Sequence, residues 1–209
     1  MKHNFIIMIL IALNSNIFAQ NQIAEEILNK LNTTTKSYNN ISLEFILLIE
    51  NKNQRIKNQE KGSLDLEGDK FRLIMNNQTI INDGKSQWIY LEDINEVQII
   101  ENDTTENIIS PNKLFSIFEE DYKYNYIGTQ SVKGKTLHII DIFPKKSQEF
   151  MKISSEINTI NNQIEKITIY DKNGFTYTYS IIAFKTNTKI KPIMFNIADF
   201  PNAEVIDLR

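Results

Sequence analysis

The sequence predicts a mainly β protein with helices, in which one large curved antiparallel sheet forms an unclosed barrel with a helical lid over an apolar cavity. Three observations support this. Short runs with period-two alternation of apolar residues fill most of the chain from residue 41 onward, separated by turn residues. An amphipathic helical pattern precedes them at residues 22–38, and a short apolar helical pattern interrupts them at residues 110–121.

The first helix rests on the spacing of its apolar residues. Acidic Glu25 and Glu26 lie in its first half, and basic Lys30 and Lys36 follow, which suits the helix dipole. Its expected apolar stripe consists of Ile23, Ile27, Leu28 and Leu31.

The first strand is expected in ISLEFILLIE, which starts at residue 41 and has an apolar residue at every second position, with Ile46 and Leu48 making part of its other face apolar too. Its inward face would hold Ile41, Leu43, Phe45, Leu47 and Ile49. Further strand-like runs occupy residues 62–76, 78–83, 85–91 and 95–100. The turn signals between and within them are Gly68-Asp69, Asn76-Asn77, Asp83-Gly84 and Glu92-Asp93, which together indicate an antiparallel meander.

The second helix begins with Ser110 as a cap and Pro111 at the first helical position. Strand patterns then resume and continue to about residue 184, with a clear turn at Asp171–Gly174. The last segment contains Pro192 and Pro201, so it is expected to be partly extended and partly a short turn or helix. The total is about ten strands and two or three helices.

A sheet of this size must curl or fold over. A strongly bent, incompletely closed barrel has a concave apolar face, with helices over its mouth. If side chains fill that face, it is an ordinary core, and if it stays open, it is a cavity large enough for lipid.

The first nineteen residues have the features of a secretory signal peptide. Lys2 and His3 precede a nine-residue apolar run at 5–13, and Ala19 is the expected residue before cleavage. The run is too short for a permanent membrane helix, which needs about 20 residues. We therefore expect an exported protein, with residues 1–19 removed and residues 20–209 forming a single domain.

Charge and cysteine content exclude several classes of protein. The formal net charge is -3, and removal of Lys2 makes it -4, so the mature chain is a poor candidate for binding nucleic acid. The chain has no cysteine, so disulfides and thiolate metal sites are excluded.

Catalytic and metal-binding patterns are weak. Beyond the signal peptide the only histidine is His138, which is expected to be a half-buried strand residue. Asp171, Asn173 and Gly174 resemble part of a calcium loop, but Ile169 occupies the first position and Ser180 the last, so a hairpin explains them better. We predict a binding protein, not an enzyme, without a cofactor or metal.

The segment INDGKSQWIYLEDINEVQI, residues 81–99, resembles the signature of the LolA family of periplasmic outer-membrane lipoprotein carriers. The matching positions are Ile81, Asp83, Gly84, Lys85, Trp88, Tyr90, Val97 and Gln98. Residues 62–73 resemble the second hairpin of the family, and SPNKLFSIF, from residue 110, stands where the family has a lid helix. The ending PNAEVIDLR is similar to the form found in the Bacteroidetes branch.

The resemblance implies a carrier that shields the acyl chains of lipoproteins and shuttles them from the inner to the outer membrane. It also implies an ATP-driven exporter in the inner membrane as donor, an outer-membrane acceptor that the sequence does not identify, and a monomer. In better-known members an Arg-Pro pair latches the lid. Here Glu67-Gly68-Asp69 stands in its place, so that latch is not transferred, and Arg72 is not assigned the role.

The candidate acyl-chain site combines strand residues with residues of the lid. Met75 suits variable apolar ligands because its side chain is flexible. Trp88 is expected either to fill one end of the core or to wall the cavity. The full set is Phe45, Leu47, Phe71, Leu73, Met75, Trp88, Leu114, Phe115 and Phe118.

Two other functions remain open at this point. The same fold could carry another acyl or polyene lipid, such as a pigment or polyketide intermediate. The chain could also be a periplasmic sensor that binds mislocalised lipoprotein, although a sensor of that kind usually carries a second domain.

Overall fold

The computed structural model describes residues 21–101 and 122–209 of the 209-residue chain. One helix, over residues 21–36, precedes a single sheet whose twelve strands follow the order β12-β6-β5-β4-β3-β2-β1-β11-β10-β9-β8-β7. The strands are β1 Ile41–Asn51, β2 Ile56–Glu67, β3 Lys70–Met75, β4 Gln78–Asn82, β5 Ser86–Leu91, β6 Glu96–Glu101, β7 Tyr122–Val132, β8 Lys135–Pro144, β9 Phe150–Asn158, β10 Ile164–Asp171, β11 Thr176–Thr186 and β12 Glu204–Asp207. Two 3₁₀ turns lie at η1 Glu92–Ile94 and η2 Ile197–Asp199.

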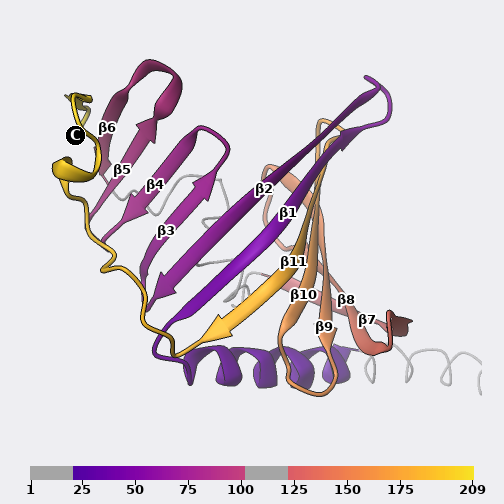
Figure 1. Ribbon diagram of the computed structural model, residues 1–209. Helices are drawn as coiled ribbons and strands as arrows, with labels where there is room; N and C mark the ends of the chain where they lie inside the picture. Colours follow the sequence, from indigo (N-terminus) through magenta and orange to yellow (C-terminus); the bar gives the residue numbers. More distant parts are fainter. Residues whose placement is uncertain (1–20, 102–121) are drawn as a thin grey trace, which may run out of the picture.

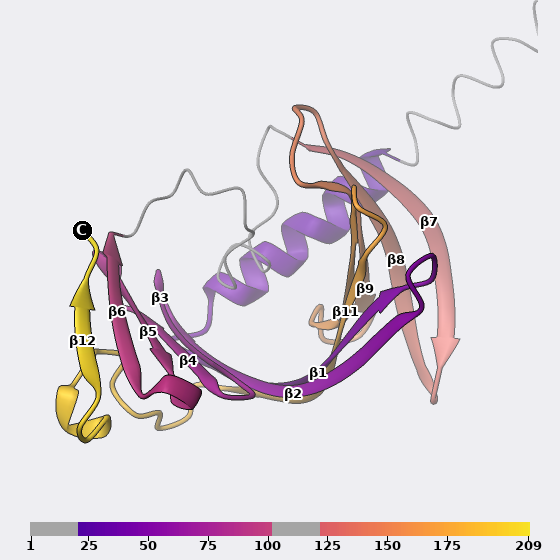
Figure 2. The same ribbon diagram turned by 90° about the horizontal axis from the view of Figure 1, so that it is seen from above.

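The sheet curves strongly and does not close, as expected from its sequence pattern. Seen from above, it forms an open U with the helix inside the curve (Figure 2). Its two edges are β7 and β12, which do not pair with each other. β1 joins the two halves of the sheet, because it pairs with β2 along its whole length on one side and with β11, from the opposite end of the chain, on the other (Figure 1).

The meander from β2 to β6 confirms the predicted turns. Gly68 and Gly84 have positive φ angles of 58° and 92°, which glycine adopts without a steric penalty. In the second of these turns the Asp83 side chain accepts bonds from the backbone N–H groups of Lys85 and Ser86, at 2.9 and 3.0 Å. This Asx-type bonding holds the hairpin that leads into β5.

The strand count and the last segment differ from the prediction. About ten antiparallel strands were expected, whereas the sheet has twelve, and β12 pairs with β6 in parallel. The cause is the path of residues 187–209, which we call the C-terminal strap. The strap leaves β11 near the middle of the sheet and crosses to the far edge, a crossover that allows parallel pairing (Figure 1).

The main core lies between the helix and the concave face of the sheet. The helix buries Ala24, Ile27, Leu28 and Leu31 against buried residues of β1, β2, β3, β8, β9 and β10. Ile23 was predicted in this stripe but is 41% exposed, and Ala24 takes its place. The predicted inward face of β1 is confirmed, with Ile41, Leu43, Phe45 and Leu47 all at most 4% exposed.

The predicted second helix, residues 110–121, lies outside the described residues.

Candidate functional site

The concave face brings together most of the predicted acyl-chain residues. Antiparallel pairing sets cross-strand rows that share one face of a sheet. One row runs Ile41–Leu66–Phe71, the next Leu43–Leu64–Leu73, and the third Phe45–Gly62–Met75. Leu47 belongs to the same face of β1. The structure therefore places Phe45, Leu47, Phe71, Leu73 and Met75 on one continuous apolar surface.

Burial divides this surface into two parts. Phe45, Leu47 and Phe71 are only 2–3% exposed, so they already pack in the core with the helix. Leu73 and Met75 pack against that core but stay half-buried. Among the described residues, the open apolar surface therefore begins at Leu73 and Met75 of β3.

The open part continues across β4 and β5 through residues that the sequence analysis missed. The Leu73 row extends to Ile80 and Ile89, both half-buried, and Leu91 lies on the same face of β5. Alternation within β4 and β5 was visible in the sequence. Only the strand register shows that these residues face the same way as Leu73.

Gly62 leaves room for two of the cavity-face side chains. A Cβ atom at Gly62 would lie 2.8 Å from Cε2 of Phe45 and 2.9 Å from Cγ of Met75, and would also meet Cζ of Phe45. The Phe45 ring therefore occupies the space that a side chain at position 62 would fill.

Gly62→Ala is expected to destabilise the fold by about 1–3 kcal/mol, because Phe45 and Met75 must move aside in a packed region. Ser63→Ala, one residue along on the other face, is the matched control and should change the free energy of unfolding by less than about 0.5 kcal/mol. Urea denaturation measures both. If Gly62→Ala were as stable as Ser63→Ala, the packing of the Phe45 ring would not require a glycine at position 62.

The structure contradicts the prediction that Trp88 walls the acyl-chain cavity. The row that contains Trp88 runs Arg72–Ile81–Trp88–Ile99, one position out of phase with Phe71 and Leu73. Trp88 therefore points to the convex face and does not wall the cavity. Its ring stacks on Phe195 of the C-terminal strap, with ring centroids 5.4 Å apart and planes at 2°.

The convex face of β3–β6 has its own small apolar cluster beneath the C-terminal strap. Tyr90 packs on Phe200 at 4.6 Å between ring centroids, and Phe195 stacks on Phe200 at 5.7 Å. The strap runs along the outside of the curve here (Figure 2). The buried aliphatic residues here are Ile81 and Val97 of the sheet and Ile193 of the strap.

Arg72 holds the beginning of this strap segment. Its guanidinium donates hydrogen bonds to the backbone carbonyls of Lys191, at 3.2 Å, and Pro192. The Asp65 carboxylate lies 3.8 Å away on the neighbouring strand. Since the Arg72 side chain is only 10% exposed, these acceptors satisfy a largely buried charge.

The predicted lid residues Leu114, Phe115 and Phe118 lie outside the described part of the chain.

The far arm of the concave face carries tyrosines that the sequence analysis did not single out. Tyr179 of β11 lies in the row of Leu47, and its ring packs on Phe45 at 5.5 Å. Burial raises the pKa of Tyr179, so its hydroxyl stays neutral at physiological pH. Tyr122 of β7 stacks on Phe150 at 6.4 Å. Neutral hydroxyls on apolar rings suit an amphipathic ligand better than a charged one.

His138 is a half-buried strand residue, as predicted. Its Nδ1 atom lies 3.1 Å from the hydroxyl of Tyr126 on β7. Burial, and then the charge of Lys30 on the helix, lower the pKa of His138 below its usual 6.5. The imidazole is therefore neutral at pH 7.

An NMR titration should place the pKa of His138 below 6.5 in the wild-type protein, with a smaller depression in Lys30→Gln. The pKa of His138 is lower in the folded state than in the unfolded state. Neutral His138 therefore contributes to the free energy of unfolding above the unfolded-state pKa, and this contribution is lost as the pH falls through the folded-state pKa. Lys36→Gln, with its charge at the far end of the helix, is the control. A His138 pKa at or above 6.5 would contradict this assignment.

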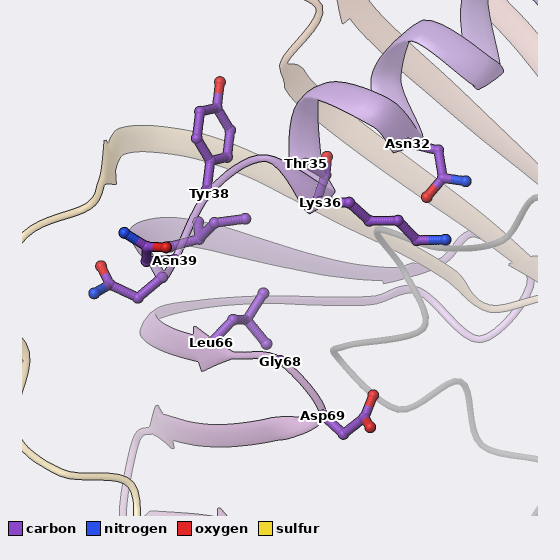
Figure 3. A pocket seen from close by; sticks show the side chains of 10 residues that line it. Asn32, Thr35, Lys36, Tyr38, Asn39, Leu66, Gly68 and Asp69 are labelled. Carbon is purple, nitrogen blue, oxygen red and sulfur yellow. The ribbon is translucent and has the colours of Figure 1, made fainter.

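A pocket of about 260 Å³ lies at the carboxyl end of the helix (Figure 3). Its apolar side is formed by Ile41 and Leu66, which are core residues. Its polar side is formed by Asn32, Thr35 and Lys36 of the helix and by Asp69 of the β2–β3 turn. The pocket is therefore amphipathic, and its apolar wall is part of the hydrophobic core.

Over residues 21–101 and 122–209, no group of three or more histidine or acidic side chains could hold a metal ion. The Asp171–Gly174 segment forms the β10–β11 hairpin, as predicted. No helix in those ranges is long and apolar enough to cross a bilayer. What the described site offers is apolar surface with neutral polar groups at its margins.

Solved structures from Thermus thermophilus and Mycobacterium tuberculosis share this architecture at low sequence identity. An uncharacterised conserved protein from Thermus thermophilus aligns with a TM-score of 0.56 at 12% identity, over 88% of this chain and 98% of that chain. The Mycobacterium tuberculosis lipoprotein LppX aligns at 0.50 and 10% identity, over 82% and 98%. A putative outer-membrane lipoprotein-sorting protein domain from Vibrio parahaemolyticus aligns at 0.48 and 13%, over 87% and 97%. No curated protein sequence matches the chain.

The described residues form an open twelve-stranded sheet with an apolar concave face under a helix. The model of the family "Outer membrane lipoprotein carrier protein LolA" matches residues 36–198, and the chain belongs to this family. The family's description is that of a carrier of outer-membrane lipoproteins.

Proposed function

We propose that this protein shields the acyl chains of lipoproteins in the periplasm and shuttles them from the inner to the outer membrane. The observation that carries the proposal is the half-buried apolar surface that continues the core across β3, β4 and β5. Leu73, Met75, Ile80 and Ile89 lie there on the concave side of an open sheet. Membership of the LolA family supports the same reading.

The energetics favour a reversible shield over a tight fit. Each methylene exposed to water costs about 0.8 kcal/mol, so three acyl chains cannot cross an aqueous space unaided. A carrier must also release its cargo, which favours adaptable contacts. Met75 and the partly buried tyrosines supply such contacts, because they combine apolar area with mobile or amphipathic ends.

The proposed cycle needs partners at both membranes. Residues 1–19 act as the cleaved signal peptide, and residues 20–209 act as one monomeric carrier domain. An ATP-driven exporter in the inner membrane delivers the cargo, and an outer-membrane acceptor receives it. The segment of residues 110–121, for which the sequence predicts a helix with Leu114, Phe115 and Phe118, serves as the lid over the acyl chains.

The test is native mass spectrometry of the tagged mature protein, isolated gently from the periplasm. Bound triacylated lipoproteins of several identities are the expected result, and the mass of the mature chain should place the cleavage after Ala19. A single polyene or pigment precursor would identify a specialised lipid carrier instead. An empty protein that also takes up no acyl probe would show that the concave face is only core.

A further inference from the structure

The pocket at the carboxyl end of the helix is too small for acyl chains. At about 260 Å³ it falls just below the range for whole small-molecule ligands, about 300–1,000 Å³. A lipid with two or three chains would overfill it several times. If the pocket takes part in cargo binding, it takes one polar fragment of the cargo.

The position of the pocket connects it to the acyl surface. Its apolar side, Ile41 and Leu66, belongs to the cross-strand row that continues to Phe71. The next row along β2 and β3 contains Leu73, where the open apolar face begins. A ligand with its chains on that face would therefore have its head within reach of the pocket.

The polar side has the chemistry of an uncharged, hydrogen-bonding head. Asn32 and Thr35 have no hydrogen-bonding partner for their side chains among the described residues, and both are only partly exposed. Lys36 and Asp69 contribute one charge of each sign from opposite walls, so the pocket has no net charge (Figure 3). Ester carbonyls and hydroxyls can use amide, hydroxyl and ammonium donors without bringing a charge of their own.

The remaining polar groups of the pocket hold its shape. The Asn40 side chain donates to the carbonyl of Thr188 at 2.9 Å and accepts from its N–H at 3.1 Å. The Tyr38 hydroxyl accepts a bond from Gln163 at 3.2 Å. Because these groups connect the loop after the helix to the strap and to the β9–β10 turn, the pocket is preformed.

We propose that this pocket is a head-group subsite that binds the ester-linked glyceryl head of an acylated cargo. The proposal rests on the proposed carrier function. Such a head occurs in lipoproteins and in free glycerolipids. The two sources share the glyceryl ester and differ in the attached peptide.

The test uses Asn32→Trp, which fills the pocket from the helix, and Asp69→Trp, which fills it from the β2–β3 turn. Thr33→Trp is the matched control, because Thr33 is exposed on the same helix and does not line the pocket. Three probes are titrated into the full mature protein: a fluorescent fatty acid without a glyceryl head, a diacylglycerol and a triacylated lipopeptide. The last two compete with the bound fatty acid.

We expect both pocket variants to weaken diacylglycerol and lipopeptide binding at least about tenfold and to leave fatty-acid binding within about twofold. The fatty acid thereby also reports that the variants are folded. Loss of lipopeptide binding alone would overturn the glyceryl assignment and indicate that the pocket binds peptide. Equal loss of all three probes, or no loss, would overturn the subsite. Failure of the wild-type protein to bind the fatty acid would instead refute the carrier function itself.

Discussion

Leu73→Glu is expected to reduce the affinity of the protein for an acyl probe at least about tenfold, which corresponds to about 1.4 kcal/mol. Leu73 lies at the point where the buried core becomes open apolar surface, in one row with Ile80 and Ile89. A carboxylate there must either stay desolvated next to the ligand or draw water onto the acyl chains, and both cost free energy. A fluorescent fatty-acid titration measures the effect, and the native mass spectrum should show less bound lipoprotein.

Ile74→Glu is the matched control for this substitution. Ile74 follows Leu73 on the same strand, faces the convex side and is 42% exposed. The same charge at this position should leave the affinity for the probe within about twofold of wild type. If Leu73→Glu folds and binds the probe as well as Ile74→Glu does, the concave face is not the acyl-chain site.

Trp88→Ala is expected to lower the free energy of unfolding by about 3 kcal/mol, the lower end of the range for removing a packed aromatic ring. The ring lost is the one that stacks on Phe195, which itself stacks on Phe200. The C-terminal strap should then detach from the convex face. Because Trp88 points away from the concave face, acyl-probe affinity should stay within about twofold of wild type.

Hydrogen exchange provides the second measurement for Trp88. In Trp88→Ala the amides of β12 should exchange faster, since β12 adds only Glu204–Asp207 to the edge of β6. Phe195→Ala removes the other half of the same stack and should produce the same pattern. If the Trp88→Ala protein had normal stability but had lost acyl binding, Trp88 would have to be assigned to the cavity wall after all.

Local patterns in the sequence predicted much of this fold. The apolar residues at every second position from Ile41 to Ile49 predicted β1 and its buried face, because a strand turns successive side chains to opposite sides. The helical stripe located Ile27, Leu28 and Leu31, although Ala24, a small residue with no strong hydrophobic signal, proved to be buried where Ile23 was expected. Asp83-Gly84 predicted a tight turn because glycine adopts positive φ.

The candidate site was predictable in part. Phe45, Leu47, Phe71, Leu73 and Met75 were expected together and do share the concave face. Ile80 and Ile89 were missed because alternation shows that a strand has two faces without showing which one turns inward. That choice depends on the register between strands, and a shift by one residue reverses it.

The sequence by itself determined the β-rich class, most strand and turn positions, and the shared face of Trp88 and Tyr90, because all of these follow from local backbone geometry. Only the tertiary structure decided which side that face is on, and it is the convex side. A segment more than a hundred residues later in the chain returns there and places Phe195 on Trp88, with Arg72 bonded to Lys191 and Pro192. The same return adds β12 in parallel to β6. Contacts between segments so distant in the chain leave no local period in the sequence, so they could be found only in the folded structure.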